Sequence, residues 1–139
     1  MIDELVSKGF LTKTKSDKKQ IEGSLQISQR FIERAEGNIK IGLWDVAFLM
    51  SYNSMFHSAR ALLFRMNLKE RSHQAMITGL RELYADNKPI VEFLNTLSSY
   101  KTARNAIQYS GGLCLEVDAV EALKDAKRFL EEADKILSK

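Results

Sequence analysis

The chain has 139 residues, of which 45% are hydrophobic and 28% charged, and its formal net charge is +3. Its length is that of one domain, since domains usually hold roughly 100–200 residues. A single cysteine, Cys114, excludes an internal disulfide framework and a cysteine-based zinc cage. No apolar run reaches the roughly 18–20 residues that span a bilayer, and the N-terminus does not resemble a signal peptide. We therefore expect a cytoplasmic protein that does not contact a membrane.

Residues 1–16 end in a stretch rich in lysine. This composition predicts a mobile or loosely docked N-terminal arm, followed by a helical domain over residues 17–139. The first long helix is expected to begin near Ser16 or Asp17, because either side chain can accept a hydrogen bond from a free backbone N–H group. Its buried face is predicted from steps of three and four residues: Ile21, Leu25, Ser28, Ile32, Ala35 and Ile39. Gly42 is placed to end it.

A second helix is expected over residues 44–66, and it is apolar on more than one side. A helix of this kind lies at the centre of a bundle and packs against several neighbours. It belongs to a stretch without acidic residues, from Val46 to Lys69, that includes Arg60. Ser72 is placed to begin a third, shorter helix as its N-cap.

Two more helices follow along the chain. Pro89 fits the first turn of one, which Gly111-Gly112 ends. One face of that helix reads Phe93, Leu97, Tyr100, Arg104 and Ile107. The last helix runs from about residue 118 to residue 137, and no strand-like alternation is found anywhere. The pattern predicts an all-α protein, an antiparallel four-helix up-and-down bundle with an additional short helix.

The motifs of several common chemistries are missing from the sequence. There is no Gly-rich phosphate loop, no dinucleotide fingerprint, no His-Glu-x-x-His metal helix and no Gly-x-Ser-x-Gly nucleophile turn. The Glu-x-x-His pairs of a di-iron bundle are also missing. We therefore expect neither a metal ion nor a cofactor.

Arg104 interrupts an otherwise apolar helix face. Because a guanidinium keeps its charge, an arginine there needs a carboxylate, a phosphate or several carbonyl groups. Its own helix offers no acid between Phe93 and Leu115. Two interpretations stay open: Arg104 lies at the edge of the face or pairs with an acid from another helix, or it binds a phosphate. Asn105 and Tyr109 lie one turn apart beside it, and each is also explained as an ordinary surface or packing residue.

The chain contains two histidines. His57, on the central helix, is expected to be a core histidine with satisfied hydrogen bonds. His73 follows the expected N-cap Ser72, where the helix dipole disfavours its protonation. A neutral histidine there can act as a base, and it is equally explained as a surface or packing residue. Cys114, between two leucines, is expected to be buried and inert.

Several short segments, taken in their order, resemble the HEPN domain (higher eukaryotes and prokaryotes nucleotide-binding), and most closely its small stand-alone prokaryotic members. Residues 47–63 resemble the central helix of the family, Ser72-His73 resembles the pair that opens the next helix, and residues 8–11 resemble the N-terminal arm. Residues 104–109, Arg-Asn-Ala-Ile-Gln-Tyr, fall where the family carries an arginine, a polar residue and, a turn later, a histidine. Tyr109 stands in the place of that histidine.

The resemblance implies a four-helix bundle with a short extra helix that forms a homodimer through the faces carrying the signature. Active members are metal-independent endoribonucleases, and many are toxins paired with a minimal nucleotidyltransferase antitoxin. By this resemblance Arg104 of each subunit would hold the scissile phosphate of RNA, and Asn105 would orient that arginine or the RNA. Tyr109 would take the catalytic place of the histidine, although an ordinary tyrosine pKa of about 10 makes it a poor base.

The residues expected to bind RNA or a nucleotide are Arg60, His73 and Lys101. Three hypotheses remain. The protein is an RNA-cleaving toxin, or it is a non-catalytic nucleotide- or RNA-binding module or adaptor for a nucleotidyltransferase, or it is a plain helical dimer whose features all serve packing. Under the first two, Arg104 lies at a solvent-reachable cleft near its dimer mate. Under the third, Arg104 is buried against an acid.

Overall fold

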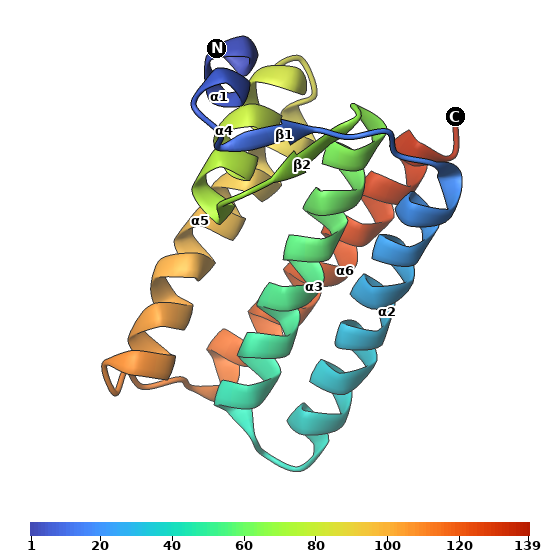
Figure 1. The fold of residues 1–139 in the computed structure, drawn as a ribbon. Coiled ribbons are helices and arrows are strands. Elements are labelled where there is room, and N and C mark those ends of the chain that lie inside the picture. Colours follow the sequence, from blue (N-terminus) through green and yellow to red (C-terminus); the bar gives the residue numbers. More distant parts are fainter.

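The computed structural model describes residues 1–139 and contains six helices and two short strands (Figure 1). The four long helices are α2 (Lys18–Lys40), α3 (Trp44–Arg65), α5 (Lys88–Tyr109) and α6 (Glu116–Leu137). They run alternately up and down, which confirms the predicted all-α bundle. At one end gather the short helices α1 (Ile2–Ser7) and α4 (His73–Leu83) and the strands β1 (Leu11–Lys13) and β2 (Leu68–Glu70). None of the helices combines the length and the apolar character that a membrane span requires.

Helix α3 is the central helix, as its sequence predicts. It packs against α2, α4, α5 and α6, and more than half of its residues are buried. Small side chains let α2 approach it closely. Ser28 of α2 donates a hydrogen bond to the carbonyl of Ser54 at 2.9 Å, and its hydroxyl also lies 2.8 Å from that of Ser58. All three serines are fully buried, so this shared bonding satisfies hydroxyl groups that water cannot reach.

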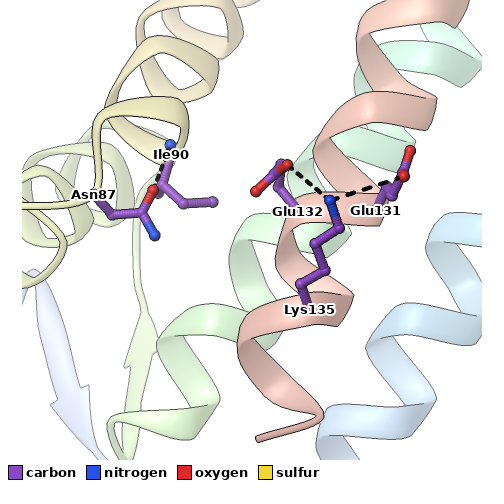
Figure 2. A network of polar contacts seen from close by, with 5 residues as sticks. All are labelled: Asn87, Ile90, Glu131, Glu132 and Lys135. Carbon is purple, nitrogen blue, oxygen red and sulfur yellow. Dashed lines mark hydrogen bonds and ion pairs between the residues drawn. The ribbon is translucent and has the colours of Figure 1, made fainter.

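The ends of the helices follow local sequence signals. Asp17 caps the start of α2, because its Oδ1 accepts a hydrogen bond from the Gln20 amide N–H at 2.8 Å. Asn87 caps α5 in the same way, accepting from the Ile90 amide at 3.1 Å (Figure 2). Gly42, just beyond α2, has a φ of 75°, a left-handed conformation that glycine adopts without a steric penalty.

The N-terminal residues differ from the prediction. Strands β1 and β2 pair antiparallel, with Leu11 opposite Glu70. The sequence pattern predicts no strand, because each strand has only three residues, too few to show an alternation. Leu11 is 1% exposed, and Ile2, Leu5 and Val6 pack against the core. The segment expected to be mobile or loosely docked is therefore folded onto the end of the bundle. Its helix α1 is a short helix in addition to α4, the one short helix that the sequence predicts. The division at residue 16 stays a prediction.

Helix α5 is buried only in its first half. Its three buried residues are Ile90, Leu94 and Leu97, and none follows them. The second half, which carries Arg104 and Asn105, therefore lies at the surface of the bundle. The first half of α5 lies near the end of α6, which carries the acidic residues Glu131 and Glu132. Lys135 forms ion pairs with both of them, with its Nζ 4.0 Å from Glu131 Oε1 and 3.4 Å from Glu132 Oε1 (Figure 2).

Candidate functional site

Arg104 lies on the ring of Tyr52, which α3 contributes. The guanidinium carbon is 4.9 Å from the ring centroid, a distance at which a cation is attracted to the face of an aromatic ring. One terminal amino group donates to Asn105 Oδ1 at 3.0 Å. No ion pair in the structure includes Arg104, and its Nε is buried without a hydrogen-bond partner. The interpretation in which an acid from another helix neutralises Arg104 is therefore wrong.

The hydroxyl of Tyr52 reaches His73, the first residue of α4. The distance from the hydroxyl oxygen to Nδ1 is 2.7 Å. The imidazole also stacks on Phe56, with 4.2 Å between the ring centroids. Because Tyr52 and Phe56 lie one turn apart on α3, they present the same face, and both rings hold the histidine. Ser72 caps α4 by accepting from the Ala75 amide at 3.0 Å, which fixes the backbone beside His73.

Arg60 extends the same face of α3 by one further turn. Its guanidinium carbon lies 5.2 Å from the centroid of Phe56, and its Nε donates to Glu70 Oε1 at 2.6 Å. Glu70 comes from β2 and is 8% exposed, so this is a largely buried carboxylate whose charge Arg60 balances. The second carboxylate oxygen of Glu70 is buried and unpartnered. Arg60 is thus paired with a carboxylate, whereas Arg104 is not.

The charges around His73 are mostly positive. Burial, above all, lowers the pKa of His73, and the neighbouring charges of Arg104 and Lys101 lower it further. Arg60 acts in the same direction and Glu70 opposes it. Burial raises the pKa of Tyr52, although Arg104 opposes this shift. At neutral pH the site therefore holds a neutral imidazole and a protonated phenol beside permanent positive charge.

The predicted site residues are only partly brought together. Arg104 and His73 both contact Tyr52, Asn105 bonds to Arg104, and Lys101 and Arg60 act electrostatically on His73. Tyr109 differs from them: it is the last residue of α5, is 76% exposed and makes no side-chain hydrogen bond. No three His, Cys, Asp or Glu side chains gather into a group able to hold a metal ion.

The sequence does not single out Tyr52 and Phe56 as parts of the site, because both belong to a helix that is apolar on more than one side. The available signal was their spacing: with Arg60 they follow one another at steps of four, so one face of an acid-free helix carries two aromatic rings and a guanidinium. The sequence also does not single out Glu70, which lies one residue beyond the acid-free stretch and pairs back to Arg60.

Two side chains behave differently from an ordinary core position. His57 stacks on Phe31, with centroids 5.7 Å apart, yet its Nδ1 is buried without a partner, so the prediction of a fully satisfied histidine is wrong. Cys114 is only half-buried. Burial raises the pKa of its thiol, and the carboxylates of Asp118 and Asp45 raise it further, which keeps the sulfur protonated and weakly nucleophilic.

The two histidines predict a pH-dependent stability. Each has a pKa below its ordinary value of 6.5 in the folded protein, chiefly because of burial. Below about pH 6.5 the unfolded chain therefore binds more protons, and the free energy of unfolding falls as pH decreases toward the folded-state pKa values. Above pH 6.5 this contribution is complete. Urea midpoints measured from about pH 7.5 to 5 should fall more steeply for the wild type than for a His57→Gln/His73→Gln double variant, and parallel curves would contradict this.

Comparisons with known proteins identify relatives of this chain and its family. The chain is 28% identical over 120 residues to a UPF0332 protein of Gloeobacter violaceus, an alignment that covers 79% of this chain and 95% of the relative. It is 24% identical over 123 residues to a UPF0332 protein of Archaeoglobus fulgidus, covering 86% and 97% respectively. The family model of the HEPN domain, a family of nucleotide- and RNA-related function, matches residues 21–136, which include both partners of the Tyr52–His73 contact and the whole of α5. The protein therefore belongs to the HEPN family.

Proposed function

We propose that this protein is a metal-independent endoribonuclease that acts as the toxin of a toxin–antitoxin pair, with Arg104 as the residue that binds the scissile phosphate. One observation carries the proposal. Arg104 lies in the half of α5 that has no buried residue, and no carboxylate neutralises it. A permanently charged, planar donor held on an aromatic ring is suited to bind a phosphate with two parallel hydrogen bonds.

The surroundings of Arg104 support this role. Nη1 has no hydrogen-bond partner within the chain and is not among the buried atoms, so it is free to bind a ligand. Asn105 holds the other amino group and so restricts the rotation of the guanidinium. Lys101, one turn earlier, pairs with no carboxylate and adds a second positive charge for the RNA backbone. Negative charge that develops on the phosphate during cleavage would meet donors already in place.

The assembly belongs to the same proposal and is supported by the resemblance to the family. A homodimer joined through the second halves of α5 would bring two copies of Arg104 to one cleft. Exposed apolar side chains at that end of the bundle support an interface there; they are Tyr109, Leu113, Leu115 and Val117. The partner that restrains the toxin would be a minimal nucleotidyltransferase.

A second function is favoured by Tyr109. It stands where the signature has its histidine, and it is 76% exposed with no side-chain hydrogen bond to position it. A site without a histidine at this position would still bind a phosphate through Arg104. Under this alternative the protein binds RNA or a nucleotide, or serves as an adaptor for the nucleotidyltransferase, without cleaving.

The two functions are separated by incubating the full chain with a labelled single-stranded RNA and with DNA of the same sequence, in excess chelator. The proposal predicts that the RNA is cut and the DNA is not, because the cut needs a ribose 2′-hydroxyl. Binding of the RNA without cutting would favour an RNA-binding module. Neither binding nor cutting of the RNA would contradict both the nuclease and the RNA-binding module.

A further inference from the structure

His73 is held on two sides, and one of its ring nitrogens stays free. Nδ1 lies 2.7 Å from the Tyr52 hydroxyl, and the ring stacks 4.2 Å from Phe56. Nε2 makes no hydrogen bond within the chain and is not among the buried atoms without a partner. An imidazole that a hydroxyl orients through one nitrogen, with the other nitrogen open, has the geometry of a general base or acid.

The open nitrogen lies in the neighbourhood of the proposed phosphate site. Arg104 contacts the face of the Tyr52 ring and His73 contacts its hydroxyl, so a single phenol lies between them. Every element packed around the imidazole contributes a titratable or charged group. These are Tyr52, His57 and Arg60 from α3, Glu70 from β2, and Lys101 and Arg104 from α5. Glu70 is paired with Arg60, which leaves the two cations of α5 as the uncompensated charges.

We propose that His73, positioned by the Tyr52 hydroxyl, is the general base of this site and supplies the imidazole that Tyr109 does not. The inference rests on the proposed function, since it assigns a residue to the cleavage that Arg104 would support. His73 comes from α4 and not from the signature on α5. The signature position can therefore carry a tyrosine while the site keeps a histidine.

The step that His73 performs transfers one proton and exchanges one phosphorus–oxygen bond for another. Nε2 takes the proton of the ribose 2′-hydroxyl, and the 2′ oxygen forms a bond to the adjacent phosphorus. The bond from phosphorus to the 5′ oxygen of the next nucleotide breaks, and that oxygen takes a proton from water. The products are a 2′,3′-cyclic phosphate and a free 5′-hydroxyl, and the imidazolium returns its proton to solvent. Nδ1–H donates to the Tyr52 oxygen before and during this transfer, because Nε2 can accept a proton only in the tautomer that carries its hydrogen on Nδ1.

The charges set the protonation state that this role needs. A base must be neutral before it acts, and burial, with Arg104 and Lys101, lowers the pKa of His73 below 6.5. The cleavage rate should therefore rise with pH to a midpoint below 6.5 and then level off. A general acid at the same position would show the opposite profile, with a rate that falls as pH rises.

The test compares His73→Ala with His57→Ala, a matched variant of the other histidine, in RNA cleavage and in RNA binding. We expect His73→Ala to lower the cleavage rate about 100-fold or more, as the loss of a general base does, and to leave the dissociation constant within about threefold. His57→Ala should cleave like the wild type. Added imidazole should restore part of the activity to His73→Ala, which an effect on folding alone would not allow.

Tyr52→Phe tests the positioning role, because it keeps the ring under Arg104 and removes the hydroxyl. We expect cleavage to fall about tenfold, the equivalent of one hydrogen bond, with a shifted midpoint of the pH profile and unchanged RNA binding. Cleavage by His73→Ala at the wild-type rate would overturn the inference while leaving the function of Arg104 intact. A large loss that imidazole does not relieve, with a pH profile like that of the wild type, would also overturn it. A wild-type protein that binds RNA and never cuts it would overturn the proposed nuclease function and the inference together.

Discussion

Arg104→Ala is expected to lower the rate of RNA cleavage about 100- to 1,000-fold, the effect of removing one positioned donor from a developing anion. The substitution removes the one arginine of the site that no carboxylate balances. It should leave the fold intact, because the second half of α5 contributes no buried residue to the core. Initial rates on a labelled RNA in excess chelator measure the first effect, and the thermal midpoint measures the second.

Two further variants make this prediction specific. Arg104→Lys keeps the charge but loses the planar pair of donors, so its rate should fall between those of the wild type and Arg104→Ala. Arg128→Ala is the control: this exposed arginine of α6 borders a hollow that also contains Glu92 and Glu131, near the opposite end of α5. It should cleave normally. Equal losses in Arg104→Ala and Arg128→Ala would show a general effect of charge rather than a site.

Leu11→Ala is expected to lower the free energy of unfolding by about 2–5 kcal/mol, the range for truncating a buried leucine. Leu11 is 1% exposed and packs against Gly79 of α4, where an added Cβ would come within 3.0 Å of the leucine side chain. The change would leave a cavity between β1 and α4. Urea unfolding of the full chain measures the loss.

The matched control is Thr12→Ala, which changes the neighbouring strand residue on its exposed side. Exposed substitutions usually change the stability by no more than about 0.5 kcal/mol. If Leu11→Ala were as mild as Thr12→Ala, the N-terminal segment would be dispensable for the bundle, as the composition of the sequence first indicated.

The long helices could be predicted because each carries its own signals. The periodic face of α2, the all-round apolar character of α3 and Pro89 at the start of α5 are local features that the packed bundle preserves. The two strands could not be predicted. The paired residues Leu11 and Glu70 are separated by 58 intervening residues and two helices. Each strand forms by pairing with the other strand, so the residues next to it in the sequence do not indicate it.

The charged residues of the site could be predicted from the sequence, but the contacts that hold them in place could not. Arg104 can be predicted because a charged residue interrupts an apolar helix face, and its position on the ring of Tyr52 explains why the face carries a charge there. The contact from Tyr52 to His73 joins α3 to α4, and no spacing within one helix indicates a contact between two. Only the family resemblance points to Tyr109, which lies exposed at the end of α5.

The most direct test of the account is a crystal structure of the full chain with a short RNA made uncleavable by a 2′-O-methyl group at the scissile nucleotide. We expect a phosphate hydrogen-bonded to the guanidinium of Arg104, with the methylated 2′ oxygen beside Nε2 of His73. RNA bound on another face, with Arg104 still lying on Tyr52 and in contact with no phosphate, would contradict it.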